Sequence, residues 1–554
     1  MRSSTQFIAG AACLGLLLAG CTDSSDDGES ARTTVSPTSS EPDAPMTLIA
    51  DADPGAAAIS TSRALYDRSD VVVLAHPDDQ AAISLGASAA VALGVPLLLS
   101  VPDAALGTEF ERLGVTVVLA IGGDAAQGVP GGNGVQTVAV ATEPSAVAEA
   151  IGVELAPAEP VTTEELAAAF AALDPSAPVA LVPADAAAEE SNAESAPAAT
   201  TLPEVRRPEA LTGTLVLATS TPESLPGIAT ARAAGVPVQV VAPEQLDPRA
   251  SIEAITALSE AEPDAVIALG AGYAAQQGLD WKLTTAATGD QLPGGGQLLF
   301  QDRMLVALYG YTEGGALGVL GEQDANGAVQ RAIETAAEYD DLVPTRVVPA
   351  FEIIATVASE FAGPDGNYSS EADIAQLQPW VDAAGAAGIY VMLDLQPGRT
   401  DFLTQAQAYE PLLRLPHVGL TLDPEWRLLP NQVHLRQIGS VTIEEVNAVV
   451  TWLADLTRAN ALPQKLLLLH QFLPEMIQNR ELLDTSREEL AVLIHVDGYG
   501  GPGDKQATWQ ATHDAAPANV YWGWKNFIDE DLPLLTPEQT IAQALPTPEL
   551  ITYQ

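Results

Sequence analysis

The chain has 554 residues, of which 73 are Asp or Glu and 23 are Lys or Arg, so its formal net charge at pH 7 is -50. Binding to nucleic acid depends on cations that neutralise phosphates, and this charge excludes such a partner. Hydrophobic residues make up 47% of the sequence, enough for two or three packed domains in a chain of this length.

Residues 1–20 have the pattern of a secretory signal. Arg2 supplies a positive charge, and the uncharged apolar run at 7–18 is too short to cross a bilayer as a mature helix. The run ends in the sequence LAGC at 18–21, which resembles the lipobox of bacterial lipoprotein signal peptides. The resemblance implies cleavage before Cys21, a diacylglycerol on its sulfur, and a lipid-anchored protein on the extracytoplasmic face of the membrane. The alternative is an ordinary cleaved signal with a cysteine there by chance.

Residues 21–45 consist mainly of Ser, Thr, Asp, Pro and Glu, a composition that predicts a disordered tether. The other cysteine of the chain, Cys13, lies within the signal. With Cys21 committed to lipid, the mature chain is expected to have no disulfide and no thiolate metal site.

Residues 46–280 contain one pattern twice. The first copy covers 70–100 and is followed by an apolar stretch at 115–126, and the second covers 213–241 and is followed by 263–274. Each copy has a buried strand, an Ala-rich helix, a Gly-Val-Pro turn into a second strand, and a later strand that ends in glycine. Apolar runs that alternate with helical patterns predict parallel sheets with helices on their faces.

A weaker middle unit is expected between the two copies. Its predicted strands lie at 135–141 and 179–185, and its helix, at 162–173, has Thr162 or Thr163 as its cap. Residues 186–201 are polar and Ala-rich and are expected to form a disordered excursion.

The repeated order, with Gly-Val-Pro at 94–96 and Ile-Gly-Gly at 121–123, resembles the cell wall-binding repeats that occur in tandem threes on bacterial surface proteins. The resemblance covers residues 56–280. It implies three Rossmann-like units and attachment to an anionic wall polymer. Because the chain is itself acidic, such attachment would use hydrogen bonds, stacking or bridging divalent cations. The alternative is a duplicated α/β scaffold that acts as a spacer or docking surface.

The sequence Ala-His-Pro-Asp-Asp at 75–79 resembles the zinc-binding signature of N-acetylglucosaminyl deacetylases. The resemblance would make His76 and Asp79 metal ligands and Asp78 a base. However, Gln80 stands where the signature has glutamate. A strand-end loop whose aspartates cap the next helix explains these residues without zinc.

Residues 298–554, which follow a connector at 281–297, alternate between strand and helix patterns and predict a TIM-type (β/α) barrel. The eighth strand is expected near residues 432–440, or else the barrel is incomplete. The chain is therefore predicted to be α/β, with repeated Rossmann-like parallel-sheet units followed by the barrel. The clear strands are at 304–309, 346–353, 388–395, 418–422, 465–470, 491–496 and 520–524, with helices at 327–339, 371–387 and 443–459.

The site of such a barrel lies at the C-terminal ends of its strands, where acidic, aromatic and histidine residues recur in this sequence. Glycoside hydrolysis requires one protonated and one ionised carboxyl, and aromatic faces for sugar rings. We predict Glu425 as the proton donor, with its pKa raised by neighbouring aromatic rings, and Asp423 or Asp394 as the ionised carboxylate. Asp423 and Glu425 can both face the mouth if the strand stays extended through Pro424. Their spacing is similar to the DxE ending of chitinase-like barrels. The residues expected to bind substrate are Glu352, Gln396, Arg399, Trp426, His470, His495, Asp497, Tyr499, Trp522 and Trp524.

Two other functions remain open. A carbohydrate-binding or scaffold lipoprotein would have the aromatic groove without the carboxyl pair. A metal-dependent hydrolase would gather ligands around one point, whereas the glycosidase hypothesis needs neither metal nor cofactor, with a cell wall polymer or glycan as the partner. The candidate metal ligands are Asp394, Asp423, Glu425, His470, His495 and Asp497.

Overall fold

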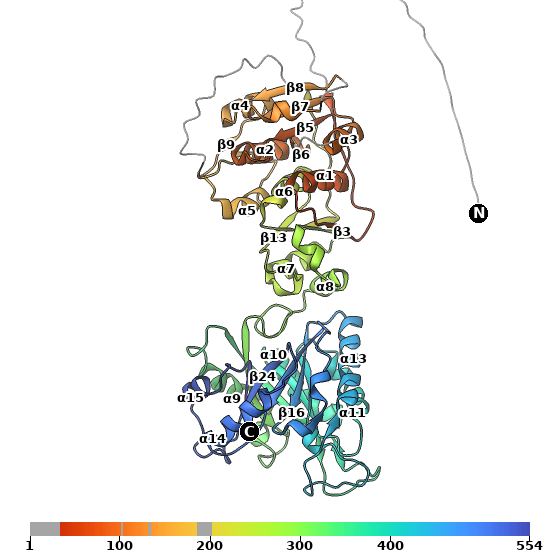
Figure 1. The fold of residues 1–554 in the computed structure, drawn as a ribbon, viewed down its shortest axis with the longest axis vertical. Helices are drawn as coiled ribbons and strands as arrows, with labels where there is room; N and C mark the ends of the chain where they lie inside the picture. Colours follow the sequence, from red (N-terminus) through yellow and green to blue (C-terminus); the bar gives the residue numbers. More distant parts are fainter. Residues whose placement is uncertain (1–33, 101–103, 131–133, 186–201) are drawn as a thin grey trace, which may run out of the picture.

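The computed structural model describes residues 34–100, 104–130, 134–185 and 202–554. Cys21 and the excursion predicted at 186–201 lie outside these residues. The described chain forms an N-terminal α/β region and a C-terminal barrel, arranged one above the other (Figure 1). Within the described ranges, none of the helices combines the length and the apolar character needed to cross a membrane.

The first sheet of the α/β region has four parallel strands in the order β6-β5-β7-β8. Three of them are buried along their whole length, which explains why they are continuous apolar runs in the sequence. The strand predicted at 135–141 for the middle unit is β8, and it belongs to this sheet instead, as the edge strand beside β7. The elements are β5 (Val71–Ala75), α2 (Gln80–Leu93), β6 (Leu97–Leu99), α3 (Ala104–Leu113), β7 (Val117–Ile121), β8 (Gln136–Val140) and α4 (Pro144–Ile151).

The loop that resembles a zinc signature is a helix cap. Asp79 is the N-cap of α2, and its Oδ1 accepts a hydrogen bond of 2.8 Å from the backbone N–H of Ala82. The side chain of Asp78 is 93% exposed. Each aspartate therefore has the ordinary role of a strand-end loop residue.

The second sheet has the order β13-β12-β14-β3, and its first three strands repeat the order of β6-β5-β7 in the first sheet. Its fourth strand, β3, comes from the beginning of the region. Helix α6 packs against both α1 and α2, and one hydrophobic core includes residues of both sheets. The elements are β3 (Met46–Ile49), α1 (Pro54–Leu65), β12 (Thr214–Thr219), α6 (Leu225–Ala233), β13 (Val238–Val241), α7 (Ile252–Ala261) and β14 (Ala265–Leu269).

The described chain that links the two sheets forms only short strands and helices. Strands β9 (Ala156–Pro157) and β10 (Val179–Ala180) pair in parallel, and Thr162 forms a capping box ahead of α5 (Leu166–Ala171). Residues 34–39, predicted to lie in the tether, also form strands. They are β1 (Thr34–Val35), which pairs with β11 (Glu204–Val205), and β2 (Thr38–Ser39), which pairs with β4 (Tyr66–Arg68).

The predicted connector begins as a helix, α8 (Leu279–Ala286), and then closes the end of the barrel that faces the α/β region, where the strands begin. Leu292 and Leu299 are buried in the barrel interior. Arg303 donates hydrogen bonds to the carbonyls of Pro293 and Gly295, and Arg346 donates to that of Gly294. The three glycines at 294–296 have φ values of 88°, 92° and 71°, a conformation that favours glycine.

Charged and aromatic side chains join the α/β region to the barrel. The Trp281 ring lies between the guanidinium groups of Arg249, at 4.4 Å, and Arg458, at 4.7 Å. Lys282 of α8 forms an ion pair of 2.5 Å with Glu488 of the barrel. The junction is therefore a packed interface rather than a free linker.

The barrel is closed and has eight parallel strands, which confirms the TIM-type prediction. The eighth strand is β25 at the end of the chain, and it pairs with β15 and β24. The prediction of a strand near 432–440 was therefore wrong, and these residues form a loop. The strands are β15 (Arg303–Gly310), β16 (Arg346–Ala358), β18 (Tyr390–Leu395), β19 (Val418–Leu422), β21 (Lys465–His470), β23 (Leu490–Val496), β24 (Tyr521–Asn526) and β25 (Leu550–Tyr553), with β17 (Ser369–Glu371) added antiparallel to β16.

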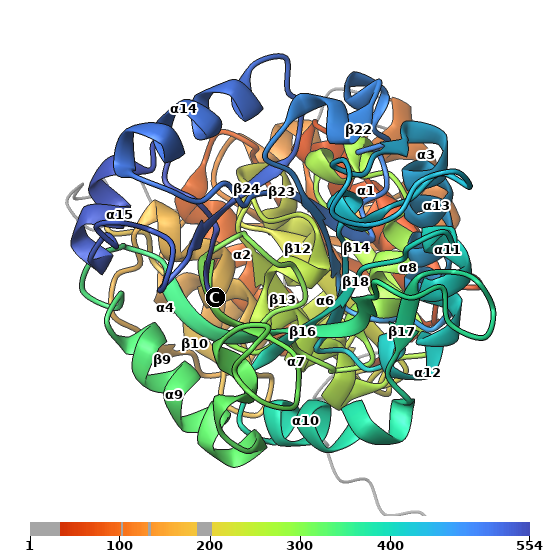
Figure 2. The same cartoon turned by 90° about the horizontal axis from the view of Figure 1, so that it is seen from below.

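Helices surround the strands, as the view along the barrel shows (Figure 2). The strands begin beside the connector, so their C-terminal ends point away from the α/β region. The helices are α9 (Ala325–Ala337), α10 (Ile374–Ala386), α11 (Phe402–Ala408), α12 (Glu410–Leu413), α13 (Ile443–Ala459), α14 (Pro502–His513) and α15 (Pro537–Gln543).

The four lysines of the chain are all buried, with 0% to 4% of their surface exposed. Lys282 lies at the junction. Lys465 is the first residue of β21, at the N-terminal end of the barrel strands, and donates to the carbonyls of Leu415 and Val418. Burial lowers the pKa of Lys465 to about 7. Lys505 pairs with Asp531 at 2.7 Å, and Lys525 lies at the barrel mouth.

Candidate functional site at the barrel mouth

A cavity of about 610 Å³ opens at the C-terminal ends of the strands. Strand residues alternate between the barrel interior and the surrounding helices, so only every second residue of a strand can reach this cavity. On β15, for example, Leu305 and Ala307 belong to the interior core, and Tyr309 continues this series into the cavity. The residues that line it include Tyr309, Gln396, Asp423, Glu425, Trp426, His470, Phe472, Asp497, Tyr499, Lys525 and Phe527.

His470 is the centre of a buried hydrogen-bond network. Its Nε2 lies 2.6 Å from Oε1 of Glu352 and its Nδ1 lies 2.9 Å from Oδ2 of Asp497. Burial alone would lower the pKa of His470, but the two carboxylates raise it well above its usual value. His470 is therefore a cation that donates from both ring nitrogens.

The second histidine, His495, has the opposite character. Its ring centroid lies 5.0 Å from that of His470, and its Nε2 lies 3.1 Å from the hydroxyl of Thr552. Burial and the positive charge of His470 lower the pKa of His495 well below its usual value. The pair thus consists of one charged and one neutral imidazole.

The carboxyls at the mouth outnumber the cations near them. Burial raises the pKa of Asp394 to about 6, and burial together with Asp394 and Glu425 raises that of Asp423 well above its usual value. Burial and the charge of Asp497 raise the pKa of Glu425 to about 7. Asp497 differs from these groups, because its contact with His470 outweighs burial and lowers its pKa.

The turn after β19 places Asp423 and Glu425 at the cavity. The strand ends at Leu422, and residues 424–426 form a 3-10 turn, so the condition of an extended chain through Pro424 is not met. Asp423 caps this turn by accepting from the backbone N–H of Glu425 at 3.2 Å. Both side chains nevertheless line the cavity.

Of the three residues predicted to be catalytic, Asp394 lies deeper than the other two. It is fully buried and accepts a hydrogen bond of 2.9 Å from the hydroxyl of Tyr309. The pKa of Asp423 is raised well above the usual aspartate value, whereas that of Asp394, at about 6, leaves this carboxyl mainly ionised at pH 7. The carboxylate with a lowered pKa at the cavity is Asp497, whose Oδ1 is buried without a hydrogen-bond partner.

The predicted substrate-binding residues separate into three groups. Gln396, Trp426, His470, Asp497 and Tyr499 line the cavity. Glu352 and His495 are fully buried in the network beneath it. The others, Arg399, Trp522 and Trp524, do not line it.

Arg399 and the two tryptophans have other contacts. The guanidinium of Arg399 stacks on Tyr368 at 4.3 Å and donates to the carbonyl of Gln432. Trp522 stacks on His513 at 3.5 Å, and Trp524 contacts Trp509 at 5.4 Å, so both lie on the outer side of β24 against α14. Alternation explains this result, because Trp522 and Trp524 cannot share a face with Lys525.

The sequence prediction missed Tyr309, Lys525 and Thr552. The Nζ of Lys525 lies 3.6 Å from the centroid of the Tyr309 ring, and Thr552 contacts both Glu352 and His495. Period-two alternation could have found Lys525 and Tyr309, since each continues the inward series of its strand. Thr552 belongs to the strand that was not predicted.

Glu352, His470 and His495 could approach a metal ion, because one ligand atom from each lies within 4.8 Å of the others. Glu352 is absent from the ligand set predicted for a metal-dependent hydrolase, and only the two histidines belong to both sets. In this arrangement His470 uses both nitrogens to contact carboxylates, so it has no free lone pair for a metal.

Comparisons with known proteins add little. No family model and no curated protein matches the chain. Among solved structures, Cwp6 from Clostridium difficile matches with 15% sequence identity and a TM-score of 0.33. The match covers 56% of this chain and 63% of Cwp6, which is less than two thirds of that protein. A similarity this low says nothing about the function of this chain.

Proposed function

We propose that the barrel hydrolyses a glycosidic bond in an envelope glycan, with Glu425 as the general acid and Asp497 as the ionised carboxylate. The observation that supports this proposal is that two carboxyls at one cavity favour opposite protonation states. The pKa of Glu425 is raised to about 7, and that of Asp497 is lowered. Glycoside hydrolysis uses one carboxyl of each kind.

In this mechanism Glu425 protonates the oxygen of the leaving sugar. Asp497, which lines the cavity, either attacks the anomeric carbon with a carboxylate oxygen or removes a proton from the attacking water. His470 holds the other oxygen of Asp497 and keeps the carboxylate ionised. Neutral Asp423, which lines the cavity and whose pKa is raised well above its usual value, would donate a hydrogen bond to a sugar hydroxyl. Proton NMR of the first anomer released distinguishes the two routes, because attack by Asp497 retains the anomeric configuration.

The test is the turnover of a broad glycan panel by the protein and by Glu425→Gln and Asp497→Asn variants. Loss of general acid catalysis should lower kcat by about 10²- to 10⁴-fold, with glycan binding largely kept. Glu444→Gln is the matched control, because Glu444 is an exposed carboxyl at the start of α13. If no glycan is turned over, the proposal fails and a carbohydrate-binding function replaces it. Full activity of Glu425→Gln would instead show that Glu425 is not the general acid.

We also propose that the protein is held at the cell surface by lipid on Cys21, on the basis of the lipobox. Cys21→Ala should then move the protein from the membrane fraction to the soluble fraction of the cells. Continued dependence on detergent for extraction would contradict the anchor.

The proposal of attachment to wall polymer through the α/β region rests on the repeated pattern in the sequence and on two sheets in which three strands have the same order. The protein without its lipid should sediment with purified wall material, and calcium should strengthen this binding because both partners are acidic. If no wall material is bound with or without calcium, the α/β region is better regarded as a spacer or docking surface.

A further inference from the structure

Two more hollows adjoin the mouth cavity. One, of about 310 Å³, shares Glu425 and Trp426 with it. The other, which we call the side groove, has a volume of about 570 Å³ and is lined by residues 438–440, 473–481 and 514–515. It shares Leu473 with the mouth cavity and Ile438 with the smaller hollow. The three hollows are therefore adjacent parts of one surface.

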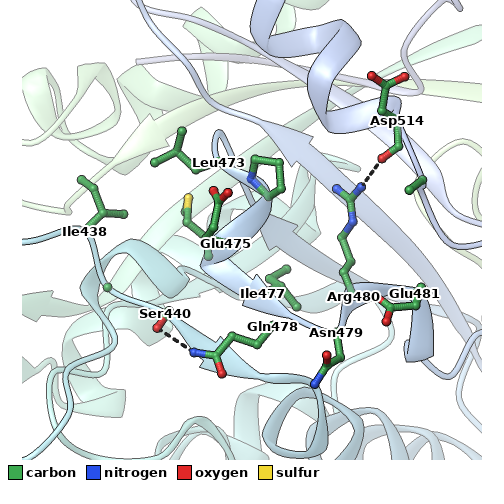
Figure 3. A pocket seen from close by; sticks show the side chains of 14 residues that line it. Ile438, Ser440, Leu473, Glu475, Ile477, Gln478, Asn479, Arg480, Glu481 and Asp514 are labelled. Carbon is green, nitrogen blue, oxygen red and sulfur yellow. Dashed lines mark hydrogen bonds between the residues drawn. The ribbon is translucent and has the colours of Figure 1, made fainter.

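The side groove has a fixed frame. Strand β20 (Val441–Thr442) pairs in parallel with β22 (Ile477–Gln478), which joins the two segments that line the groove. The buried side chain of Arg480 donates to Oε1 of Gln471 at 2.6 Å and to the carbonyl of Asp514 at 3.0 Å (Figure 3). These contacts hold the groove open beside the mouth.

The groove combines apolar and neutral polar surface. Leu473 and Ile438 are 41% and 43% exposed, so both present apolar surface to a molecule in the groove. The amides of Gln478 and Asn479 and the hydroxyl of Ser440 lie on the same groove (Figure 3). Its cation, Arg480, is already bonded, and Glu475 and Glu481 would repel an anion.

An acetamido sugar has the chemistry that this surface fits. Its methyl group is apolar and would cover Leu473 or Ile438, and its amide and hydroxyl groups would bond to Gln478, Asn479 and Ser440. We infer that the substrate is a chain of neutral acetamido sugars that passes from the mouth cavity over Leu473 into the side groove. This inference rests on the proposed hydrolase function and names its substrate class.

The test measures the binding of β-1,4-linked N-acetylglucosamine oligomers, from dimer to octamer, to the whole protein by titration calorimetry. Affinity should rise with chain length until the groove is filled. Cello-oligomers have the same linkage without the acetamido group and should gain less with length. A Ser440→Ala, Gln478→Ala double variant should bind the octamer about tenfold more weakly and the dimer equally well.

The double variant is a clean probe, because Nε2 of Gln478 donates to Oγ of Ser440 at 3.2 Å and both partners are removed together. Gln378→Ala is the control, since Gln378 lies on the exposed side of α10 and bonds to Asp382. Affinity that does not depend on length, an equal loss for dimer and octamer, or an equal gain with cello-oligomers overturns the inference.

Turnover of the same oligomers separates this inference from the proposed function. If the oligomers are hydrolysed at rates that do not depend on their chain length, the side-groove inference is overturned and the hydrolase proposal is supported. Binding that rises with length without turnover of any glycan supports the side groove and overturns the hydrolase. If no oligomer binds, the side-groove inference is overturned, and the hydrolase proposal then depends on the turnover of the wider glycan panel.

Discussion

The α/β region and the barrel are both built from parallel strands covered by helices, but they treat buried charge differently. In the α/β region, buried Glu109 contacts Arg63, Arg112 and Ser62 at 2.6 to 3.0 Å, and these contacts outweigh burial and lower its pKa. At the barrel mouth, several carboxyls share few cations, and the pKa values of Asp394 and Asp423 rise instead. The same architecture therefore serves stability where buried charges are neutralised and favours chemistry where they are not.

The largest expected effect comes from removing the central residue of the buried charge network in each region. His470→Ala leaves Glu352 and Asp497 buried without their cation and should lower the free energy of unfolding by about 3–5 kcal/mol. Glu109→Ala should cost about 1–3 kcal/mol, because the arginines it releases are partly exposed and can be solvated. Denaturant unfolding of both variants measures the difference. A larger loss for Glu109→Ala would contradict the comparison.

The pH dependence of catalysis sharpens the contrast. Glu425 acts in its protonated form, so kcat/KM should fall about tenfold per unit as the pH rises above about 7. Asp497 acts in its ionised form and its pKa is lowered, so activity should persist down to a pH below about 4, the ordinary aspartate value. Initial rates over this pH range check both limbs. An optimum above pH 8 would be incompatible with Glu425 as the acid.

A smaller loss of stability is expected when a methyl group is placed against His495 in the buried network at the barrel mouth. A Cβ on Gly523 would lie 2.6 Å from Cδ2 of His495, so Gly523→Ala should displace this ring and cost about 1–3 kcal/mol of stability, together with activity. Gly503→Ala is the control, because Gly503 lies in α14 with open space around its Cβ position. That variant should be neutral or slightly stabilised. Equal thermal shifts in the two variants would contradict the close contact.

The smallest effect distinguishes the aromatic residues inside the cavity from those outside it. Tyr499 lines the cavity and is 69% exposed, so Tyr499→Ala should raise KM by a few-fold. Trp522→Phe should leave KM unchanged, because Trp522 packs against His513 on the outer side of β24. Steady-state kinetics of the two variants gives the comparison, which fails if Trp522→Phe has the larger effect.

Much of the fold could be predicted because buried parallel strands appear in the sequence as short apolar runs. The eighth barrel strand could not, since Leu550–Tyr553 has only four residues and pairs with β15 at the other end of the barrel sequence. The loop at 432–440 was mistaken for a strand because Val433 and Leu435 alternate with polar residues, the pattern of a half-buried strand. Two of its apolar residues, Val433 and Leu435, are exposed on the surface.

The site was less predictable than the fold, because its chemistry depends on distances between strands. Residue type and strand position indicated Asp423, Glu425, His470 and Asp497, all of which line the cavity. The protonation states could not be read in the same way. The pKa of Asp497 is lowered and that of Asp423 is raised because Nδ1 of His470 lies 2.9 Å from Asp497 but 4.0 Å from Asp423.

The burial of every lysine gives the protein an unusual chemical surface. A reagent that acylates amines meets no lysine side chain on the folded surface, so each lysine should react only when its surroundings open. Modification of Lys282 would then report separation of the junction. Modification of Lys465 would report an opening at the N-terminal end of the barrel strands, and modification of Lys525 would report an opening at the mouth. Mass spectrometry of acylated peptides would thus show which part of the molecule yields first.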